Sequence, residues 1–387
     1  MTAPPYVLLQ ASANAIPLAD ESVQCVVTSP PYWGLRQYAG EQTVKWADGG
    51  EHALGLEPTP ELYVEHMVEV FREVRRVLRA DGTLWLNLGD SYAGARSAGG
   101  GTMAGFNDRY FGRESDGGKQ TVMDGSKPAR AAVDGLKAKD LVGIPWMVAF
   151  ALRSDGWYLR SDIIWHKPNP MPESVTDRPT KAHEYLFLLS KSERYYYDAD
   201  AIREPSITND PRRPYTSEGA WQLDGRPAEK RHGGEIRSGE DFSGRNKRSV
   251  WTIATRPYPG AHFATYPEDL VEPCILAGSA PTACGTCGAP WERVTERVGI
   301  ESRAVGWRPT CEHTDGSGRS LVLDPFNGSG TTGAVAIRLG RSYVGLDISA
   351  EYLHEQAVAR IDPLGAAAIA AINAVDSGDE AQGVLAL

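Results

Sequence analysis

Short apolar runs alternate with longer amphipathic stretches along the chain. Residues 6–29 predict a strand that begins at residue 6, a turn at 16–22 and a second strand at 23–29, and residues 83–92 predict a further buried strand. Residues 58–79 instead repeat apolar positions at helical spacing, with Thr59 as a suitable N-cap and one face made of Leu62, Met67, Val70, Phe71, Val74, Val77 and Leu78. We expect a turn at residues 80–82 to close this helix before the next strand begins.

The same alternation continues through the second half of the chain. The pattern predicts a helix over 140–155, strands over 157–167 and 184–198 with a proline-rich connection, a helix over 267–279, a strand, glycine loop, helix and strand over 320–349, and a last helix from about residue 350. Strands that alternate with helices predict an α/β fold with a doubly wound, mainly parallel sheet and helices on both faces.

Three segments interrupt this pattern. Residues 93–135 are rich in Gly, Ser and charge and are expected to form a long mobile loop, residues 203–250 are polar and basic, and residues 279–318 form an insert. We therefore divide the chain into a first half of the core (1–200), a polar region (201–255), a second half of the core (256–361) and a tail (362–387).

Composition and charge narrow the class of protein. With 41% hydrophobic and 23% charged residues the chain has an ordinary globular composition. No apolar stretch approaches the length of a membrane span, and the N-terminus lacks a signal-peptide pattern, so we expect a cytoplasmic protein without membrane contact. The net charge is −10, yet residues 225–256 carry eight Arg/Lys and four Asp/Glu, a local net charge of +4 that suits one polyanion-binding face or a solvated loop.

A glycine loop follows the strand that ends near Asp324. Gly328, Gly330 and Gly333 form a G-x-G-x-x-G pattern, and Asp347 lies 19 residues beyond the first glycine. Such a loop lets a ligand approach the backbone, and a carboxylate at the next strand end can bind both hydroxyls of a ribose. The pattern therefore predicts an adenosine site.

The carboxylate of Asp324 indicates which adenosine cofactor the site would bind. It would repel the pyrophosphate of NAD, whereas it suits a cationic neighbour such as the ammonium group of a methionine moiety. This favours S-adenosylmethionine, with Phe326 and Ile348 as apolar walls for the adenine.

"TSPPYW" at 28–33, read together with "DPFNGSGTTG" at 324–333, resembles the DNA amino-methyltransferases, which methylate exocyclic nitrogens of cytosine or adenine. The order of the two motifs, 295 residues apart, resembles the beta group of that family. The resemblance implies a Rossmann-like methyltransferase sheet with an inserted DNA-recognition region. It also implies cofactor contacts from Asp324, Pro325, Phe326, Gly328, Ser329, Gly330, Thr331, Asp347 and Ile348, and from His262, Phe263 and Pro267 in a further cofactor segment.

The chemistry of the first motif fits an exocyclic amine, whose lone pair is delocalised into the ring. Acceptors at its two hydrogens free that lone pair, and Ser29 Oγ and the Pro30 carbonyl are the candidates, held rigid by Pro30 and Pro31. The target base must leave the duplex, so that Tyr32 can stack on it with Trp33 as second wall or support.

Several alternatives remain open. In the family, Ser at the first motif position resembles the cytosine-N4 enzymes, which favours cytosine N4 with adenine N6 as the alternative. A nicotinamide oxidoreductase leaves "TSPPYW" unexplained, and an inactive DNA-binding module leaves the complete motif unexplained. Cys274 follows a proline, as the nucleophile for carbon-5 methylation does, but it lies in a helical apolar pattern, so that mechanism is rejected.

Four metal-ligand residues cluster in the insert. Cys284, Cys287, Cys311 and His313 have the spacing of a closed structural zinc site, and we expect Zn²⁺ there without a catalytic role. A redox pair and unpaired loop cysteines are the alternatives.

The polar region coincides with the family's recognition region. We expect double-stranded DNA to contact Lys167, Asn169, Arg226, Lys230, Arg231, Arg237, Arg245, Lys247 and Arg248, in addition to Trp33. A cognate restriction endonuclease is a candidate partner, and a monomer or a homodimer is expected.

Overall fold

The computed structural model describes residues 6–34, 43–93, 135–204, 245–256, 266–298 and 301–361, the side chains of 297–303 excepted. The strands are β1 (Tyr6–Gln10), β2 (Val23–Thr28), β3 (Val44–Lys45), β4 (Glu51–His52), β5 (Leu78–Leu88), β6 (Tyr158–His166), β7 (His183–Ser190), β8 (Val250–Thr252), β9 (Trp291–Val298), β10 (Glu301–Pro309), β11 (Leu321–Asp324) and β12 (Ser342–Asp347). The helices are α1 (Pro60–Val77), α3 (Ile144–Ser154), α4 (Glu268–Gly278), α5 (Thr331–Arg338) and α6 (Val358–Ile361), with a 3₁₀ turn at Asp200–Ile202 and a π-helix over Tyr352–Ala357.

Eight of these strands form one mixed sheet in the order β1-β12-β11-β2-β5-β7-β6-β8. The pairs from β1 to β5 are parallel, as is β6 with β8, whereas β7 runs antiparallel to both β5 and β6. The predicted mainly parallel α/β sheet is confirmed. Its two antiparallel pairings both involve β7, which forms a hairpin with β6 through the proline-rich connection.

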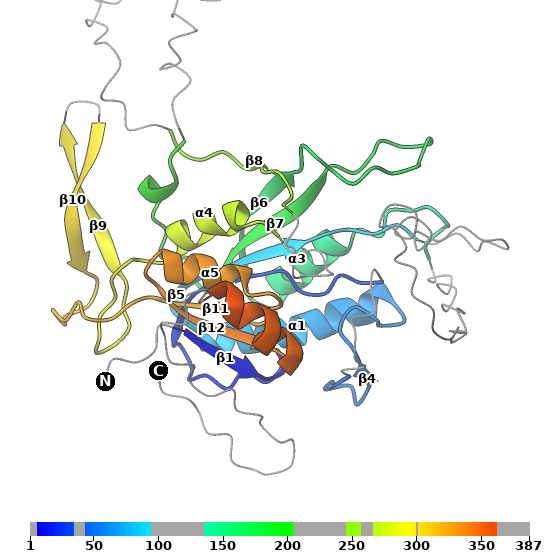
Figure 1. Cartoon of the computed structure of the whole chain (residues 1–387), viewed down its shortest axis with the longest axis horizontal. Coiled ribbons are helices and arrows are strands. Elements are labelled where there is room, and N and C mark those ends of the chain that lie inside the picture. Colours follow the sequence, from blue (N-terminus) through cyan, green and yellow to red (C-terminus); the bar gives the residue numbers. More distant parts are fainter. Residues whose placement is uncertain are drawn as a thin grey trace, which may run out of the picture.

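Helices cover both faces of this sheet, as Figure 1 shows. On one face α1 and α3 pack against the strands around Phe71, Leu86 and Val148. On the other face α4, α5 and the C-terminal helical segment pack around Trp85, Cys274 and Val335. The antiparallel hairpin β9-β10 stands beside the sheet rather than within it (Figure 1).

Helix α1 illustrates how closely local sequence determines an element. Thr59 Oγ1 accepts the Leu62 N–H at 3.2 Å, as expected of an N-cap, and the buried face includes Met67, Val70 and Phe71. Leu62 is only partly buried, and Tyr63 and His66 take buried positions that the apolar pattern had not included.

Several predicted boundaries are wrong. Strand β5 begins at Leu78, directly after α1, so residues 80–82 belong to a strand instead of a turn; the register with β2 shifts between Val23 and Cys25. Strand β7 ends at Ser190, because residues 191–198 leave the sheet, and α3 begins at Ile144. The predicted loop at 93–135 and the tail lie almost entirely outside the described residues.

The sheet direction brings several chain segments to one edge. The carboxyl ends of the parallel strands β2, β5, β11 and β12 share this edge, and the amino end of the reversed strand β7 joins them. Ligands of open α/β sheets bind at such an edge. In the described part of the chain, no helix has the length and apolar character needed to cross a membrane.

Candidate active site

The segment after β2 carries the predicted catalytic residues. Ser29 and Tyr32 are partly buried, Pro30 is buried, and the Tyr63 hydroxyl donates to the Pro31 carbonyl at 2.9 Å. This bond ties the turn to α1. Trp33 is 5% exposed and donates its indole N–H to the Glu57 carbonyl at 2.9 Å.

Trp33 therefore supports the turn from within the core. The expected contact of Trp33 with DNA stays a prediction; in this structure its ring is enclosed in the core.

Tyr32 lies against the end of β5. A Cβ at Gly89 would come within 2.5 Å of Tyr32 Cε2, so this position allows the aromatic ring its close approach only because it is glycine. A Cβ at Gly55, where φ is +93°, would lie 3.0 Å from the Tyr32 carbonyl oxygen, and the Gly55 N–H donates to the Glu57 carboxylate at 2.8 Å. The turn is thus fixed from two sides.

A polar cluster surrounds the Tyr32 hydroxyl. Ser29 Oγ donates to Tyr32 Oη at 3.2 Å, and Tyr32 Oη donates to Glu184 Oε2 at 2.9 Å. The amide nitrogen of Asn87 donates to Tyr32 Oη at 2.7 Å and to Glu184 Oε2 at 3.1 Å. Lys167 forms a short ion pair with the other oxygen of Glu184.

Sequence reasoning missed Asn87 and Glu184. Asn87 is the polar residue inside the apolar run "TLWLNLG", and Glu184 opens an apolar strand directly after a histidine. A polar side chain in a buried strand needs partners, and this was the available signal.

The glycine loop joins β11 to α5 as predicted. Gly328 and Gly330 have φ of +49° and +79°, and a Cβ at Gly333 would meet the Tyr343 ring at 2.5 Å. The first two glycines therefore supply the turn and the third supplies close packing of helix on strand.

Asp347 ends β12 beside this loop. Its carboxylate accepts the Gly328 N–H and the Ser349 N–H, both at 2.9 Å. Burial raises the pKa of Asp347 to about 6, although these two bonds oppose the shift. The carboxylate holds the loop in place and keeps acceptor capacity for further donors.

Asp324 lies at the end of β11 and is fully buried. Oδ1 accepts from Thr28 Oγ1 at 2.7 Å and from the Phe326 N–H at 3.1 Å. Oδ2 accepts from Tyr266 Oη at 2.9 Å and from Thr332 Oγ1 at 2.8 Å. Burial raises the pKa of this carboxyl against these bonds.

The expected contact of Asp324 with an ammonium group stays a prediction. Its four acceptor positions are already used by the protein, so the residue joins β2, α4, β11 and α5 at one buried point. Because Thr28 precedes Ser29, this point also links the catalytic turn to the glycine loop.

The remaining predicted cofactor residues surround the same loop. Phe326 and Ile348 are partly exposed, whereas Pro325, Ser329, Thr331 and Pro267 are buried, and Arg360 donates to Ser329 Oγ at 2.9 Å. His262 and Phe263 lie outside the described residues.

The four predicted metal ligands come together beside the sheet. The ligand atoms of Cys284, Cys287, Cys311 and His313 all lie within 4.8 Å of one another. Burial alone would raise the pKa of the Cys284 thiol. Hydrogen bonds from the N–H groups of Cys287 and Thr286 outweigh this effect and lower the pKa to about 7. Three thiols and one imidazole at these separations fit a closed tetrahedral metal site.

Only part of the predicted DNA-binding set is described. Arg245 and Arg248 both pair with Glu204, at 3.4 Å and 2.8 Å, and Lys247 lies over the Trp251 ring. Asn169 uses both ends of its amide on the Thr255 backbone, at 3.1 Å and 2.9 Å. Arg226, Lys230, Arg231 and Arg237 lie outside the described residues.

Contacts of Asn169 and Arg248 with DNA stay predictions. The Asn169 amide secures a turn, and the Arg248 guanidinium is partly neutralised at the base of the polar region. Lys167 lies at the active edge as expected, but its ammonium group is paired with Glu184.

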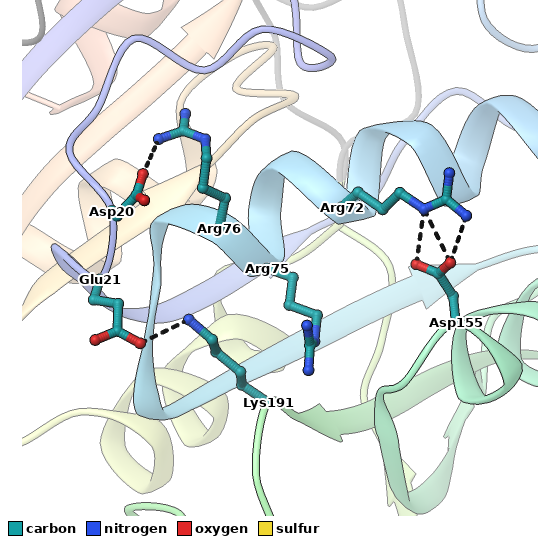
Figure 2. A pocket seen from close by; sticks show the side chains of 7 residues that line it. All are labelled: Asp20, Glu21, Arg72, Arg75, Arg76, Asp155 and Lys191. Atoms are coloured by element: carbon teal, nitrogen blue, oxygen red, sulfur yellow. Dashed lines mark hydrogen bonds and ion pairs between the residues drawn. The ribbon is translucent and has the colours of Figure 1, made fainter. Parts of the chain in front are cut away.

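A cleft of about 650 Å³ lies at the edge of the sheet opposite to the two motifs, where β2 and β5 begin (Figure 2). Figure 2 shows that ion pairs line it: Arg72 with Asp155, Arg76 with Asp20, and Lys191 with Glu21. The pairs of Arg72 and Arg76 tie α1 to neighbouring segments, the pair of Lys191 joins the end of β7 to the residues before β2, and the cleft lies away from both motifs.

Comparisons with known proteins agree with this geometry. The family model described as DNA methylase matches residues 23–359. The chain is 41% identical to the Type II methyltransferase M.SmaI of Serratia marcescens over 335 residues, which cover 87% of this chain and 83% of that protein. It is 40% identical to the Type II methyltransferase M.Cfr9I of Citrobacter freundii over 342 residues, 87% of this chain and 80% of that protein.

A solved structure, PvuII DNA methyltransferase (cytosine-N4-specific), aligns over 90% of this chain and 86% of its own, with a TM-score of 0.49 and 16% identity. We draw no argument about the substrate from it. The family match spans both motifs and the hairpin that carries Glu184, and the chain belongs to the N6/N4 DNA methylase family.

Proposed function

We propose that this protein transfers a methyl group from S-adenosylmethionine to the exocyclic N4 of a cytosine flipped out of double-stranded DNA. The observation that carries the proposal is the contact between the two motifs, which are 295 residues apart in sequence. Thr28, next to Ser29, donates to Asp324 at 2.7 Å, so the acceptor turn and the glycine loop share one sheet edge.

The residues present fit the cofactor. The backbone of Gly328 is open to close approach, and Phe326 and Ile348 are partly exposed apolar side chains near the loop. Asp347 retains acceptor capacity for ribose hydroxyls. When bound, S-adenosylmethionine supplies an electrophilic methyl group at this edge.

The catalytic turn supplies the other half of the chemistry. Ser29 Oγ and the Pro30 carbonyl accept the two amine hydrogens of the base, which localises the nitrogen lone pair for attack. Tyr32, fixed against Gly89, stacks on the flipped ring. Preorganised acceptors and stacking position the amine without a covalent enzyme intermediate.

Identification of the product tests this proposal. DNA from a host that expresses the protein is digested to nucleosides and separated by mass, with a Ser29→Ala host as control. N4-methylcytosine that is absent from the control is the expected result. N6-methyladenine would overturn the choice of base, and neither product would overturn the function.

Adenine N6 is the second candidate, because the same scaffold serves both bases in this family. Ser29 at the first motif position favours cytosine, by resemblance to the cytosine-N4 enzymes.

We further propose that the segment around 201–255 reads the DNA sequence. The Glu204–Arg248 and Glu204–Arg245 pairs fix the base of this segment to the sheet edge that carries β8. The relatives named above are Type II methyltransferases, which supports a restriction endonuclease of the same specificity as a partner.

The insert is proposed to hold structural Zn²⁺. Arg293 pairs with the nearly buried Asp198 through contacts of 3.1, 3.0 and 2.7 Å, and Arg79 donates to the Cys287 carbonyl at 3.0 Å. These contacts attach the four-ligand cluster to the body of the molecule.

Metal analysis tests the zinc proposal. Because a closed site contributes directly to folding, we expect one zinc per chain and a lower melting temperature after chelation. Cys287→Ser should reproduce the loss of metal. Purified protein without zinc, whose melting a chelator leaves unchanged, would contradict the proposal.

A further inference from the structure

A directed chain of hydrogen bonds leaves the catalytic serine and ends on a carboxylate. Ser29 Oγ donates to Tyr32 Oη at 3.2 Å, and Tyr32 Oη donates to Glu184 Oε2 at 2.9 Å. Each hydroxyl therefore gives its proton in the same direction, away from the place where the amine of the base would lie.

The surroundings keep this chain in one orientation. The Asn87 amide nitrogen lies within hydrogen-bond distance of Ser29 Oγ (3.3 Å), Tyr32 Oη (2.7 Å) and Glu184 Oε2 (3.1 Å), and its two hydrogens can serve two of these oxygens at a time. Because this nitrogen only donates, neither hydroxyl can give its hydrogen to Asn87, which favours donation along the chain toward Glu184. Lys167 pairs with Glu184 Oε1, and both side chains are 18% exposed, so an ionised Glu184 is compensated at a largely desolvated position.

We propose that Ser29, Tyr32 and Glu184 form a proton relay that removes the proton released by the methylated amine, with Glu184 as the terminal acceptor. Glu184 acts through the two hydroxyls and does not itself touch the base. The inference rests on the proposed function and deepens it, because it assigns a destination to the proton.

The nitrogen–methyl bond forms as the sulfur–methyl bond breaks, and the electron pair of the broken bond stays on sulfur. The nitrogen then carries one proton too many. This proton passes to Ser29 Oγ while the Ser29 proton moves to Tyr32 Oη and the Tyr32 proton moves to Glu184, which becomes a neutral carboxylic acid and later returns its proton to water.

Other charged groups face Glu184 from the elements around it. Lys167 approaches from the end of β6, and Lys181 and His183 precede or begin β7. Burial lowers the pKa of Lys181 and of His183. The cation that pairs directly with Glu184 is thus Lys167.

The test compares Glu184→Gln, Tyr32→Phe and the double variant in single-turnover methylation at saturating DNA and cofactor. The Phe variant keeps the stacking ring and removes only the hydroxyl link. Loss of proton removal should slow each single variant by about 10²-fold or more. Because one relay is broken either way, the double variant should be no slower than the slower single variant.

The pH profile separates a relay from a structural role. The wild-type rate should fall as the pH is lowered, because a protonated Glu184 cannot accept. Glu184→Gln should lack this decrease in rate at low pH. Cofactor affinity by calorimetry and base flipping by 2-aminopurine fluorescence should stay at wild-type levels in Glu184→Gln.

Two matched variants serve as controls. Glu173→Gln removes a carboxylate paired with Arg178, and Tyr185→Phe removes a neighbouring phenol; both should methylate at the wild-type rate. Additive losses in the double variant, or a Glu184→Gln enzyme with the wild-type rate and pH profile, would overturn the relay. Absence of methylation by the wild-type protein would instead overturn the proposed function.

Discussion

Gly89 determines how closely the catalytic aromatic approaches the sheet. Its missing Cβ leaves the space that Tyr32 occupies, and the Tyr32 hydroxyl then reaches both Asn87 and Glu184. The position of one ring therefore depends on a residue that takes no part in the chemistry.

Gly89→Ala should displace this ring. The new Cβ would meet Tyr32 Cε2 at 2.5 Å and Cδ2 at 2.9 Å, so the ring has to move. Misplacement on this scale costs on the order of 10²-fold in rate. Single-turnover methylation measures the loss. Gly306→Ala, at a position with open space, is the control, and equal rates for both variants would contradict the role of Gly89.

Asp347 makes cofactor binding depend on pH. Burial raises the pKa of this carboxyl to about 6, so it is ionised above that pH and gains a proton below it. Ribose hydroxyls donate to the ionised form, so S-adenosylmethionine affinity should be full above about pH 6 and should weaken as the pH falls through that value. Calorimetry on both sides of this pH measures it. An Asp347→Asn variant should bind weakly with a flatter profile, and a wild-type affinity independent of pH would contradict the assignment.

Among the elements, four meet at Asp324. Its carboxylate joins β11 to the end of β2, to the segment that begins α4 and to the first turn of α5. A buried carboxylate is costly unless it is fully hydrogen-bonded, so each donor contributes to the alignment of these elements.

Tyr266→Phe should loosen this junction. It removes the hydroxyl that donates to Asp324 and contacts Thr332, which leaves a buried acceptor short of a donor at a cost of about 1–3 kcal/mol in the free energy of unfolding. Chemical denaturation measures the loss. Tyr195→Phe, whose hydroxyl binds Arg160 at the surface, should change stability little, and equal stability of both variants would contradict the junction.

At the scale of the whole molecule, the sequence predicts the parallel half of the site better than the hairpin. Ser29 and Asp324 follow apolar strands, and such strand ends converge at one edge, so their proximity could be predicted from the pattern. The orientation of the Asp324 carboxylate could not be predicted, because its four donors come from the end of β2, the loop after β11, the segment before α4 and the first turn of α5. Asn87 and Glu184 carry no motif, and only their pairing across β5 and β7 brings them to Tyr32.

Because β7 runs antiparallel to β6, the strands of this hairpin can position Glu184 and Lys167 while the connection between them serves a different purpose. Glu184 lies on the paired ladder of β6 and β7 and Lys167 directly follows the last residue of β6, while residues 168–182 between them form the connection of the hairpin. This connection can change in length or composition while the ladder keeps the two charged residues in register. Contacts of this connection with the substrate can therefore change while the reaction centre stays the same. The connection is thus a position at which evolution or protein engineering can alter the protein.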